Sequence, residues 1–129
     1  MAAPQRKSQP EPRYRVLVVE DNLDAVHSMA MLIHMLGHEC QFAINGFAAL
    51  DIARVFRPEV VLLDIGLPDF TGYDIVRLLR RLPEFEKTRF IAISALPDAY
   101  GEAALEAGCN EFYRKPIDPA LLEKILAGA

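Results

Sequence analysis

Asp64 is the residue from which a chemical interpretation of this sequence begins. It ends the apolar run Val60–Leu63, which Pro58 precedes and which Gly66 and Pro68 follow. A short run of branched aliphatic residues between such breakers is typical of a strand that is buried on both faces of a parallel sheet. Ligands bind at the carboxyl ends of the strands in such sheets, so the position makes Asp64 a candidate functional residue. Taken alone, Asp64 could equally be a carboxylate that caps the next turn.

Further polar side chains stand where other apolar runs end. They are Glu20 and Asp21 after Arg15–Val19, Ser94 after Phe90–Ile93, and Lys115 shortly after Glu111–Tyr113. Carboxylates that lie close together repel one another and need a counter-charge, which a hard divalent cation such as Mg²⁺ supplies through oxygen ligands. A cation and a lysine can neutralise phosphoryl oxygens while an aspartate attacks phosphorus, so the set suits phosphoryl transfer. Taken singly, the acids could cap a helix, the serine could be a turn hydroxyl and the lysine a solvated charge.

The apolar spacing predicts five alternations of strand and helix. Strands are expected over 15–19, 39–43, 60–64, 90–93 and 111–113, and helices over 23–36, 46–56, 75–82, 97–107 and 119–126. Strands joined by helix-length crossovers pair in parallel with right-handed connections, which predicts an α/β three-layer sandwich. One sequence does not determine the strand order, but the flavodoxin-like (βα)5 order 2-1-3-4-5, a common order of such sheets, is favoured. In that order the polar strand ends would converge.

Several local signals mark the ends of these helices. Gly37 and Gly108 are expected to stop the first and fourth helices, and Asp118 with Pro119 to start the last one. Residues 71–74 have the spacing of a capping box ahead of the third helix. Gly101 lies inside the fourth helix and costs about 1 kcal/mol relative to alanine, so this helix is expected to be the softest.

Length and composition limit the class of protein. The chain has 129 residues, of which 52% are hydrophobic and 25% are charged, which predicts one globular domain. Residues 1–13 contain three prolines and little that is apolar, so they are expected to form a flexible leader, with the folded domain over 14–129. No membrane segment or signal peptide is evident, and the expected location is the cytoplasm. The formal net charge of −4 argues against direct binding of nucleic acid.

Four segments together resemble the receiver domain of two-component response regulators. They are Val18–Asn22, Leu62–Asp69, Ile93–Ala95 and Lys115–Pro116, at the ends of four expected strands. The resemblance implies a phosphoacceptor domain of a His-Asp phosphorelay that catalyses at most its own phosphorylation and dephosphorylation. A histidine kinase or a histidine phosphotransfer protein would be its phosphate donor, and a downstream protein its target. Such a domain can stand alone or belong to a hybrid histidine kinase or longer regulator, and its oligomeric state is not predicted.

The resemblance also implies the metal ligands and the reacting residue. Asp64 would accept the phosphoryl group from a phosphohistidine, and would also be a ligand of Mg²⁺. Asp21 would bind the cation directly and Glu20 through water, with the backbone carbonyl of Gly66 as a further ligand. Lys115 would pair with the phosphoryl group.

The same resemblance implies a switch. Ser94 would move to hydrogen-bond the phosphoryl group, and Phe112 would turn inward with it, which would alter the surface around the fourth helix, fifth strand and fifth helix. The Lys115–Pro116 bond would be cis. Phe112 stands where tyrosine is frequent, so it has no hydroxyl for a partner, although an aromatic at this place could also be simple core packing. Gly66 leaves no side chain two positions after the acceptor.

Two other functions are compatible with part of the pattern. A small Mg²⁺-dependent phosphohydrolase with an aspartate nucleophile would need an acid/base carboxylate at position 66, where this chain has glycine. A degenerate receiver that acts only as a constitutive binding module is disfavoured by the complete set of pocket residues.

Overall fold

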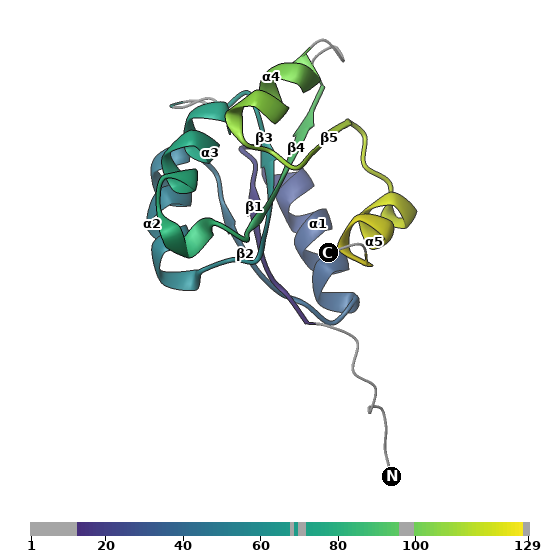
Figure 1. Cartoon of the computed structure of the whole chain (residues 1–129). Coiled ribbons are helices and arrows are strands. Elements are labelled where there is room, and N and C mark those ends of the chain that lie inside the picture. Colours follow the sequence, from purple (N-terminus) through teal and green to yellow (C-terminus); the bar gives the residue numbers. More distant parts are fainter. Residues whose placement is uncertain (1–12, 68, 70–71, 96–99, 128–129) are drawn as a thin grey trace.

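Strands and helices alternate along the computed structural model of the chain, which describes residues 13–67, 69, 72–95 and 100–127 (Figure 1). The strands are β1 Arg15–Val19, β2 Glu39–Ala43, β3 Val60–Asp64, β4 Arg89–Ser94 and β5 Glu111–Arg114. The helices are α1 Leu23–Met35, α2 Gly46–Phe56, α3 Gly72–Arg80, the 3-10 helix η2 Pro83–Phe85, α4 Tyr100–Ala107 and α5 Pro119–Ala127. The five expected alternations are therefore confirmed. None of the helices within the described ranges is long and apolar enough to cross a membrane.

The five strands form one parallel sheet in the order β2-β1-β3-β4-β5. This confirms the flavodoxin-like order that the sequence favoured. Val19 of β1 pairs with Leu63 of β3, and Asp64 pairs with Ile93 of β4. Because the strands are parallel, the residues that follow them meet at one edge of the sheet.

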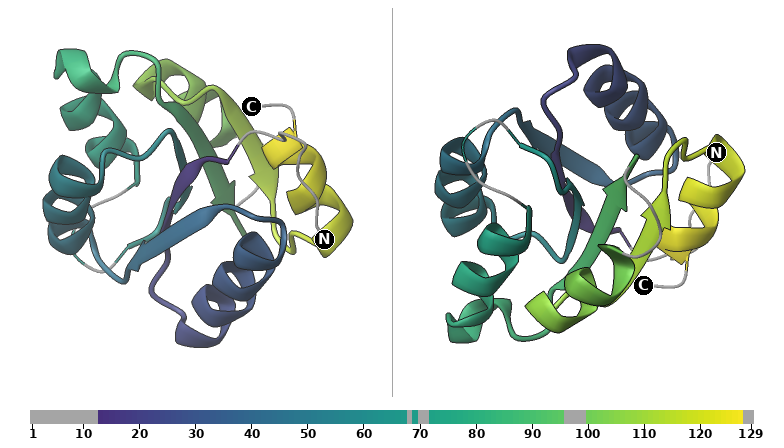
Figure 2. Two further views of the ribbon diagram at one scale, coloured as in Figure 1. Left: turned by 90° about the horizontal axis from the view of Figure 1, so that it is seen from below. Right: turned by 90° about the horizontal axis from the view of Figure 1, so that it is seen from above.

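Helices cover both faces of the sheet, as the views along it show (Figure 2). Alternate residues of the central strands point to opposite faces, so Leu17 and Val19 belong to one core and Val16 and Val18 to the other. Buried residues of α2, α3 and α4 pack in the first core, and buried residues of α1 and α5 pack in the second. The double burial explains why the strand sequences are almost continuously apolar.

The helix ends follow the local signals. Asn45 accepts a hydrogen bond from the backbone N–H of Ala48 at the start of α2 (2.8 Å), and Asp118 accepts one from Leu121 at the start of α5 (2.8 Å). Gly37 and Gly108 follow α1 and α4 with φ values of +95° and +118°, a region that glycine adopts readily. The predicted C-terminal ends of α1 and α4 and the predicted start of α5 are thereby confirmed.

The third helix ends earlier than the sequence suggested. It was expected to reach Leu82, but α3 ends at Arg80, and the last turn closes with a tight bond from the Leu82 N–H to the Leu79 carbonyl (3.0 Å). Leu82 is extended, with φ −97° and ψ 128°, because the following Pro83 disfavours the helical conformation of the residue before it. The proposed capping box and the start expected for the fourth helix fall partly outside the described residues.

The expected leader, residues 1–13, also lies outside the described residues except for Arg13. The Nε of Arg13 donates a hydrogen bond to the carbonyl of Gly37 (2.9 Å).

Candidate functional site

Three carboxylates meet at the carboxyl edge of the sheet. Asp64 is the last residue of β3, and Glu20 and Asp21 directly follow β1, its neighbour in the sheet. One carboxylate oxygen from each of the three lies within 4.8 Å of the others. Glu20 is buried, with 4% of its surface exposed, whereas Asp64 is half-buried and Asp21 is exposed. The acidic cluster expected from the sequence is thus present.

Lys115 reaches this cluster from the segment after β5. Its Nζ donates hydrogen bonds to Glu20 Oε1 (2.6 Å) and to Asp64 Oδ2 (3.0 Å). Its backbone N–H donates to the carbonyl of Ser94 (2.9 Å), which holds the segment against the end of β4. The Lys115–Pro116 bond is cis, as the resemblance implied. Lys115 is therefore a partner of both carboxylates and not a solvated charge.

The charge of Lys115 is stabilised by these partners. Burial of the side chain disfavours the ammonium form and by itself would lower the pKa of Lys115. The hydrogen bonds and charges of Glu20 and Asp64 together outweigh that effect, so the pKa of Lys115 lies above its ordinary value. The lysine stays protonated throughout the physiological range.

Backbone groups hold the two partly enclosed carboxylates in place. The backbone N–H of Asn22 donates to Glu20 Oε2 (3.1 Å), and the backbone N–H of Gly66 donates to Asp64 Oδ1 (3.2 Å). Both oxygens of Glu20 and both of Asp64 therefore accept a hydrogen bond. The cap of α1 is provided by Asn22, whose Oδ1 accepts from the Ala25 N–H (3.0 Å), so helix capping does not explain Glu20 and Asp21.

The donor set fits a hard divalent cation. Three carboxylates face one ammonium group in the described part of this edge, which leaves an excess of negative charge. All the side-chain ligands on offer are oxygen atoms, which Mg²⁺ prefers.

The space beside Gly66, two positions after Asp64, is open. A Cβ built on Gly66 meets no heavy atom within 4 Å, so a side chain at this position would not be obstructed.

Ser94 and Phe112, the two residues expected to form a switch, lie at the end of β4 and on β5. Ser94 ends β4 directly after Ile93, the register partner of Asp64, and only 1% of its surface is exposed. Phe112 of β5 is half-buried and packs against the core that α4 helps to form. Its ring lies beside Gly101 of α4, since a Cβ on Gly101 would come within 3.3 Å of Phe112 Cδ1. The placement agrees with the sequence analysis, and the movement of these two side chains stays a prediction.

Asp69 is a residue of the site region to which the sequence analysis assigned no role. Its Oδ1 accepts a hydrogen bond from the Gly46 N–H (2.7 Å) and its Oδ2 accepts one from the Phe47 N–H (3.0 Å). These donors are 23 and 22 residues away along the chain, so no local pattern would reveal the contact. Asp69 ties the segment after β3 to the first turn of α2.

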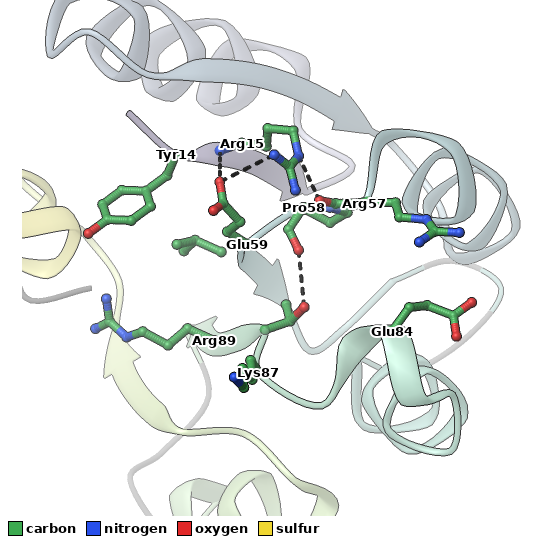
Figure 3. A pocket seen from close by; sticks show the side chains of 10 residues that line it. Tyr14, Arg15, Arg57, Pro58, Glu59, Glu84, Lys87 and Arg89 are labelled. Carbon is green, nitrogen blue, oxygen red and sulfur yellow. Dashed lines mark hydrogen bonds and ion pairs between the residues drawn. The ribbon is translucent and has the colours of Figure 1, made fainter. Parts of the chain in front are cut away.

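A hollow of about 480 Å³ lies at the opposite edge of the sheet, at the amino ends of β1, β3 and β4 (Figure 3). Its polar side chains are largely engaged with the protein itself. Arg15 Nε donates to the carbonyls of Phe56 and Arg57, and the Arg15 N–H donates to Glu59 Oε1 (2.9 Å). The hollow lies at the opposite edge of the sheet from the three carboxylates, so the candidate site is the carboxyl edge, where the carboxylates and Lys115 meet.

Comparisons with known proteins agree on one family. A family model described as the response regulator receiver domain matches residues 16–127. The polar-differentiation response regulator DivK of Brucella anthropi is 34% identical over 112 residues, which cover 85% of this chain and 91% of that protein.

Solved structures show the same fold. The response regulator receiver domain (CheY-like) from Methylobacillus flagellatus superposes with a TM-score of 0.81 and 32% identity, covering 91% of this chain and 98% of that one. The chemotaxis response regulator CheY4 of Vibrio cholerae gives a TM-score of 0.84 at 23% identity, covering 89% of this chain and 97% of that one, and supports the fold alone.

Proposed function

This chain belongs to the response regulator receiver domain family, and from that premise we propose that Asp64 is its phosphoacceptor. One observation carries the proposal. Asp64 ends a central strand with Lys115 Nζ 3.0 Å from its Oδ2 and with ligand oxygens of Glu20 and Asp21 within 4.8 Å. Receiver domains are signalling modules that act with histidine kinases and downstream effectors, so the reaction is regulatory and not the turnover of an outside substrate.

The proposed step is transfer from a phosphohistidine to Asp64. A carboxylate oxygen of Asp64 attacks the phosphorus atom, and a new O–P bond forms as the P–N bond breaks. The electron pair of that bond stays on the imidazole nitrogen of the donor, and Asp64 becomes an aspartyl phosphate. The donor is a histidine kinase or a histidine phosphotransfer protein, and the exchange takes place in the cytoplasm.

Lys115 is proposed to hold an oxygen of the transferred group. In the structure its ammonium group bridges Asp64 and Glu20, so it already lies next to the atom that becomes phosphorylated. Since its pKa is raised, Lys115 carries the positive charge that a phosphoryl oxygen requires. Ser94, at the adjacent strand end, is proposed to donate its hydroxyl hydrogen to the same group.

Mg²⁺ is proposed to bind among the acids. Asp21 and Asp64 would hold it directly, Glu20 through water, and the backbone carbonyl of Gly66 would complete the protein ligands. When bound, the cation neutralises charge on the carboxylates and on the phosphoryl oxygens. The most exposed of the three acids is Asp21, which suits a ligand of an ion that keeps part of its water shell.

Phosphorylation is proposed to alter the face formed by α4, β5 and α5. Phe112 belongs to β5 and its ring lies beside Gly101 of α4, so a change in its ring position would affect both elements. The altered face would bind or release a downstream protein, whether the domain works alone or within a longer regulator.

The test is phosphorylation by a small-molecule phosphodonor in the presence of Mg²⁺, followed by intact-mass measurement. The wild-type protein and the matched control Asp51→Asn, which neutralises an exposed carboxylate on α2, should each gain one phosphoryl group. Asp64→Asn should gain none. An adduct on Asp64→Asn would refute the assignment of the acceptor. A wild-type protein without an adduct would instead favour a degenerate binding module, and multiple turnover of diverse phosphoesters would favour the phosphohydrolase.

A further inference from the structure

The carboxylate of Asp69 joins two parts of the site edge that are distant in sequence. It accepts hydrogen bonds from the Gly46 N–H (2.7 Å) and the Phe47 N–H (3.0 Å), the first two backbone donors of α2. A carboxylate is favourable at a helix amino terminus because the unpaired N–H groups and the helix dipole attract negative charge. Asp69 comes five residues after Asp64, so its position affects the chain segment that follows the proposed phosphoacceptor.

Helix α2 does not depend on Asp69 alone for its start. Asn45 is the local cap, and its side chain accepts from the next free donor, the Ala48 N–H (2.8 Å). The two caps therefore serve the same helix end, but Asn45 is the residue next to α2, whereas Asp69 belongs to the segment after β3 and connects that segment to the helix. Loss of Asn45 would therefore remove a helix cap, whereas loss of Asp69 would remove both a cap and the link to the segment after β3.

Hydrogen bonds to the Ile65 carbonyl also hold the segment after β3 close to Asp64. The Gly72 N–H at the start of α3 donates to the Ile65 carbonyl (2.7 Å), and the Leu67 N–H donates to the same oxygen (3.2 Å). A Cβ on Gly72 would come within 2.8 Å of the Asp64 carbonyl oxygen, so the start of α3 lies directly against the backbone of Asp64. Gly66 lies between Ile65 and Leu67, which make these contacts, and its own N–H donates to Asp64 Oδ1 (3.2 Å).

The corner of β2 and α2 is in turn linked to the other acidic segment. The Glu20 N–H donates to the carbonyl of Ala43, the last residue of β2 (3.0 Å). One residue separates that strand from Asn45, which caps α2, and Gly46 begins the helix. Through Asp69, the segments that carry Glu20 and Gly66 are therefore tied to the same corner.

We infer that Asp69 is a positioning residue for the cation site. Its two hydrogen bonds fix the segment that bears the Gly66 carbonyl relative to Glu20 and Asp64, so that the oxygen ligands are arranged before the cation binds. The inference rests on the proposed function, because it concerns the same Mg²⁺ site. It adds a residue that would not touch the cation and would act through the position of the backbone at Gly66.

The test compares Asp69→Ala with Asn45→Ala, since each removes a cap from the same end of α2 at a similar cost in stability. Mg²⁺ affinity is measured by titration followed by NMR on the full chain. Asp69→Ala should raise the Kd for Mg²⁺ about tenfold, the lower end of the effect of residues that orient metal ligands. Asn45→Ala should leave the Kd close to that of the wild type. Asp69→Asn keeps one acceptor oxygen without the charge and should recover part of the affinity.

Hydrogen exchange of the metal-free proteins gives a second measurement. The Gly66 and Gly72 amides should exchange faster in Asp69→Ala than in Asn45→Ala. Equal Kd values and equal exchange in the two alanine variants would overturn the inference while leaving the proposed function intact. Equal losses of Mg²⁺ affinity in Asp69→Ala and Asp69→Asn, without faster exchange of the Gly66 and Gly72 amides, would attribute the effect to the charge of Asp69. That result would also overturn the inference. A wild-type protein that does not bind Mg²⁺ would overturn the metal site and this inference together.

Discussion

Replacing Lys115 with methionine is expected to destabilise the metal-free protein and to make its stability depend more strongly on Mg²⁺. Methionine keeps most of the apolar stem but removes the ammonium group. The change deletes the hydrogen bonds to Glu20 Oε1 (2.6 Å) and Asp64 Oδ2 (3.0 Å) and leaves the carboxylates facing one another. Glu20 has little access to water, since only 5% of its side chain is exposed.

The expected loss is about 2 kcal/mol. A hydrogen bond to a charged group contributes about 1.5–3 kcal/mol to stability, and Lys115 makes two. Part of that contribution is offset, because ordering the lysine side chain costs about 1.5–2 kcal/mol and its ammonium group is partly desolvated. For a domain of this size the net loss corresponds to a decrease in Tm of about 8 °C.

Mg²⁺ should stabilise Lys115→Met more than it stabilises the wild type, and should thereby restore part of the lost stability. The cation and the ammonium group supply positive charge to the same carboxylates, so removal of one increases the effect of the other. A cation at a hundred times its Kd stabilises a protein by about 2.7 kcal/mol. Thermal unfolding followed by circular dichroism, with and without saturating Mg²⁺, should therefore show a larger increase in Tm for Lys115→Met than for the wild type.

The matched control is Arg89→Met. Arg89 pairs with Glu111 (2.5 Å) and donates to the Ile125 carbonyl (2.9 Å), so its replacement removes a comparable pair of bonds away from the acids. This variant should lose stability but show the same Mg²⁺ response as the wild type. If the metal-free Lys115→Met protein were as stable as the wild type, or if Mg²⁺ raised the Tm of both equally, the electrostatic account of the site would be refuted.

Two further predictions concern pH and the α4–β5 contact. Because the pKa of Lys115 is raised in the folded protein, its contribution to stability is complete below the ordinary lysine pKa of about 10.4 and is lost as the pH rises through the folded value. Urea unfolding should therefore show a constant advantage of the wild type over Lys115→Met from pH 8 to about pH 10 and a smaller one as the pH rises above that, and an advantage that decreased between pH 8 and pH 9 would contradict this. Gly101→Ala should gain the helix propensity of alanine, about 1 kcal/mol, only in the Phe112→Ala background, because the Phe112 ring crowds a Cβ at Gly101. A double-mutant cycle measures this coupling, and additive effects would exclude the crowding.

The strands and most helix ends were predictable from local sequence because their causes are local. Burial on both faces requires runs such as Val60–Leu63 to be apolar, and the glycines after α1 and α4 adopt positive φ. The end of α3 was missed because its apolar spacing continues to Leu82, whereas the backbone preference imposed by Pro83 ends the helix first. The order of the strands followed from the preference of a fold class and not from any residue pattern.

The members of the site were predictable, but the contacts that orient them were not. Polar residues at strand ends meet at one edge in any parallel sheet of this order, which places Glu20, Asp64 and Lys115 together. The bonds from Asp69 to α2 span 22 and 23 residues, and no periodicity or motif specifies such a distance. Sequence therefore indicated the chemistry, while the support of the backbone around it required the structure.

The two interpretations of Asp64 with which the sequence began are not alternatives. Its Oδ1 accepts from the Gly66 N–H, as a carboxylate that caps a turn would, and its Oδ2 accepts from Lys115 Nζ. The turn bond restricts rotation of the carboxylate and so fixes the direction of the second oxygen toward the ammonium group. A capping bond would thus support the proposed phosphoacceptor role, because an acceptor that must be aligned with an incoming phosphorus atom gains from losing its rotational freedom beforehand.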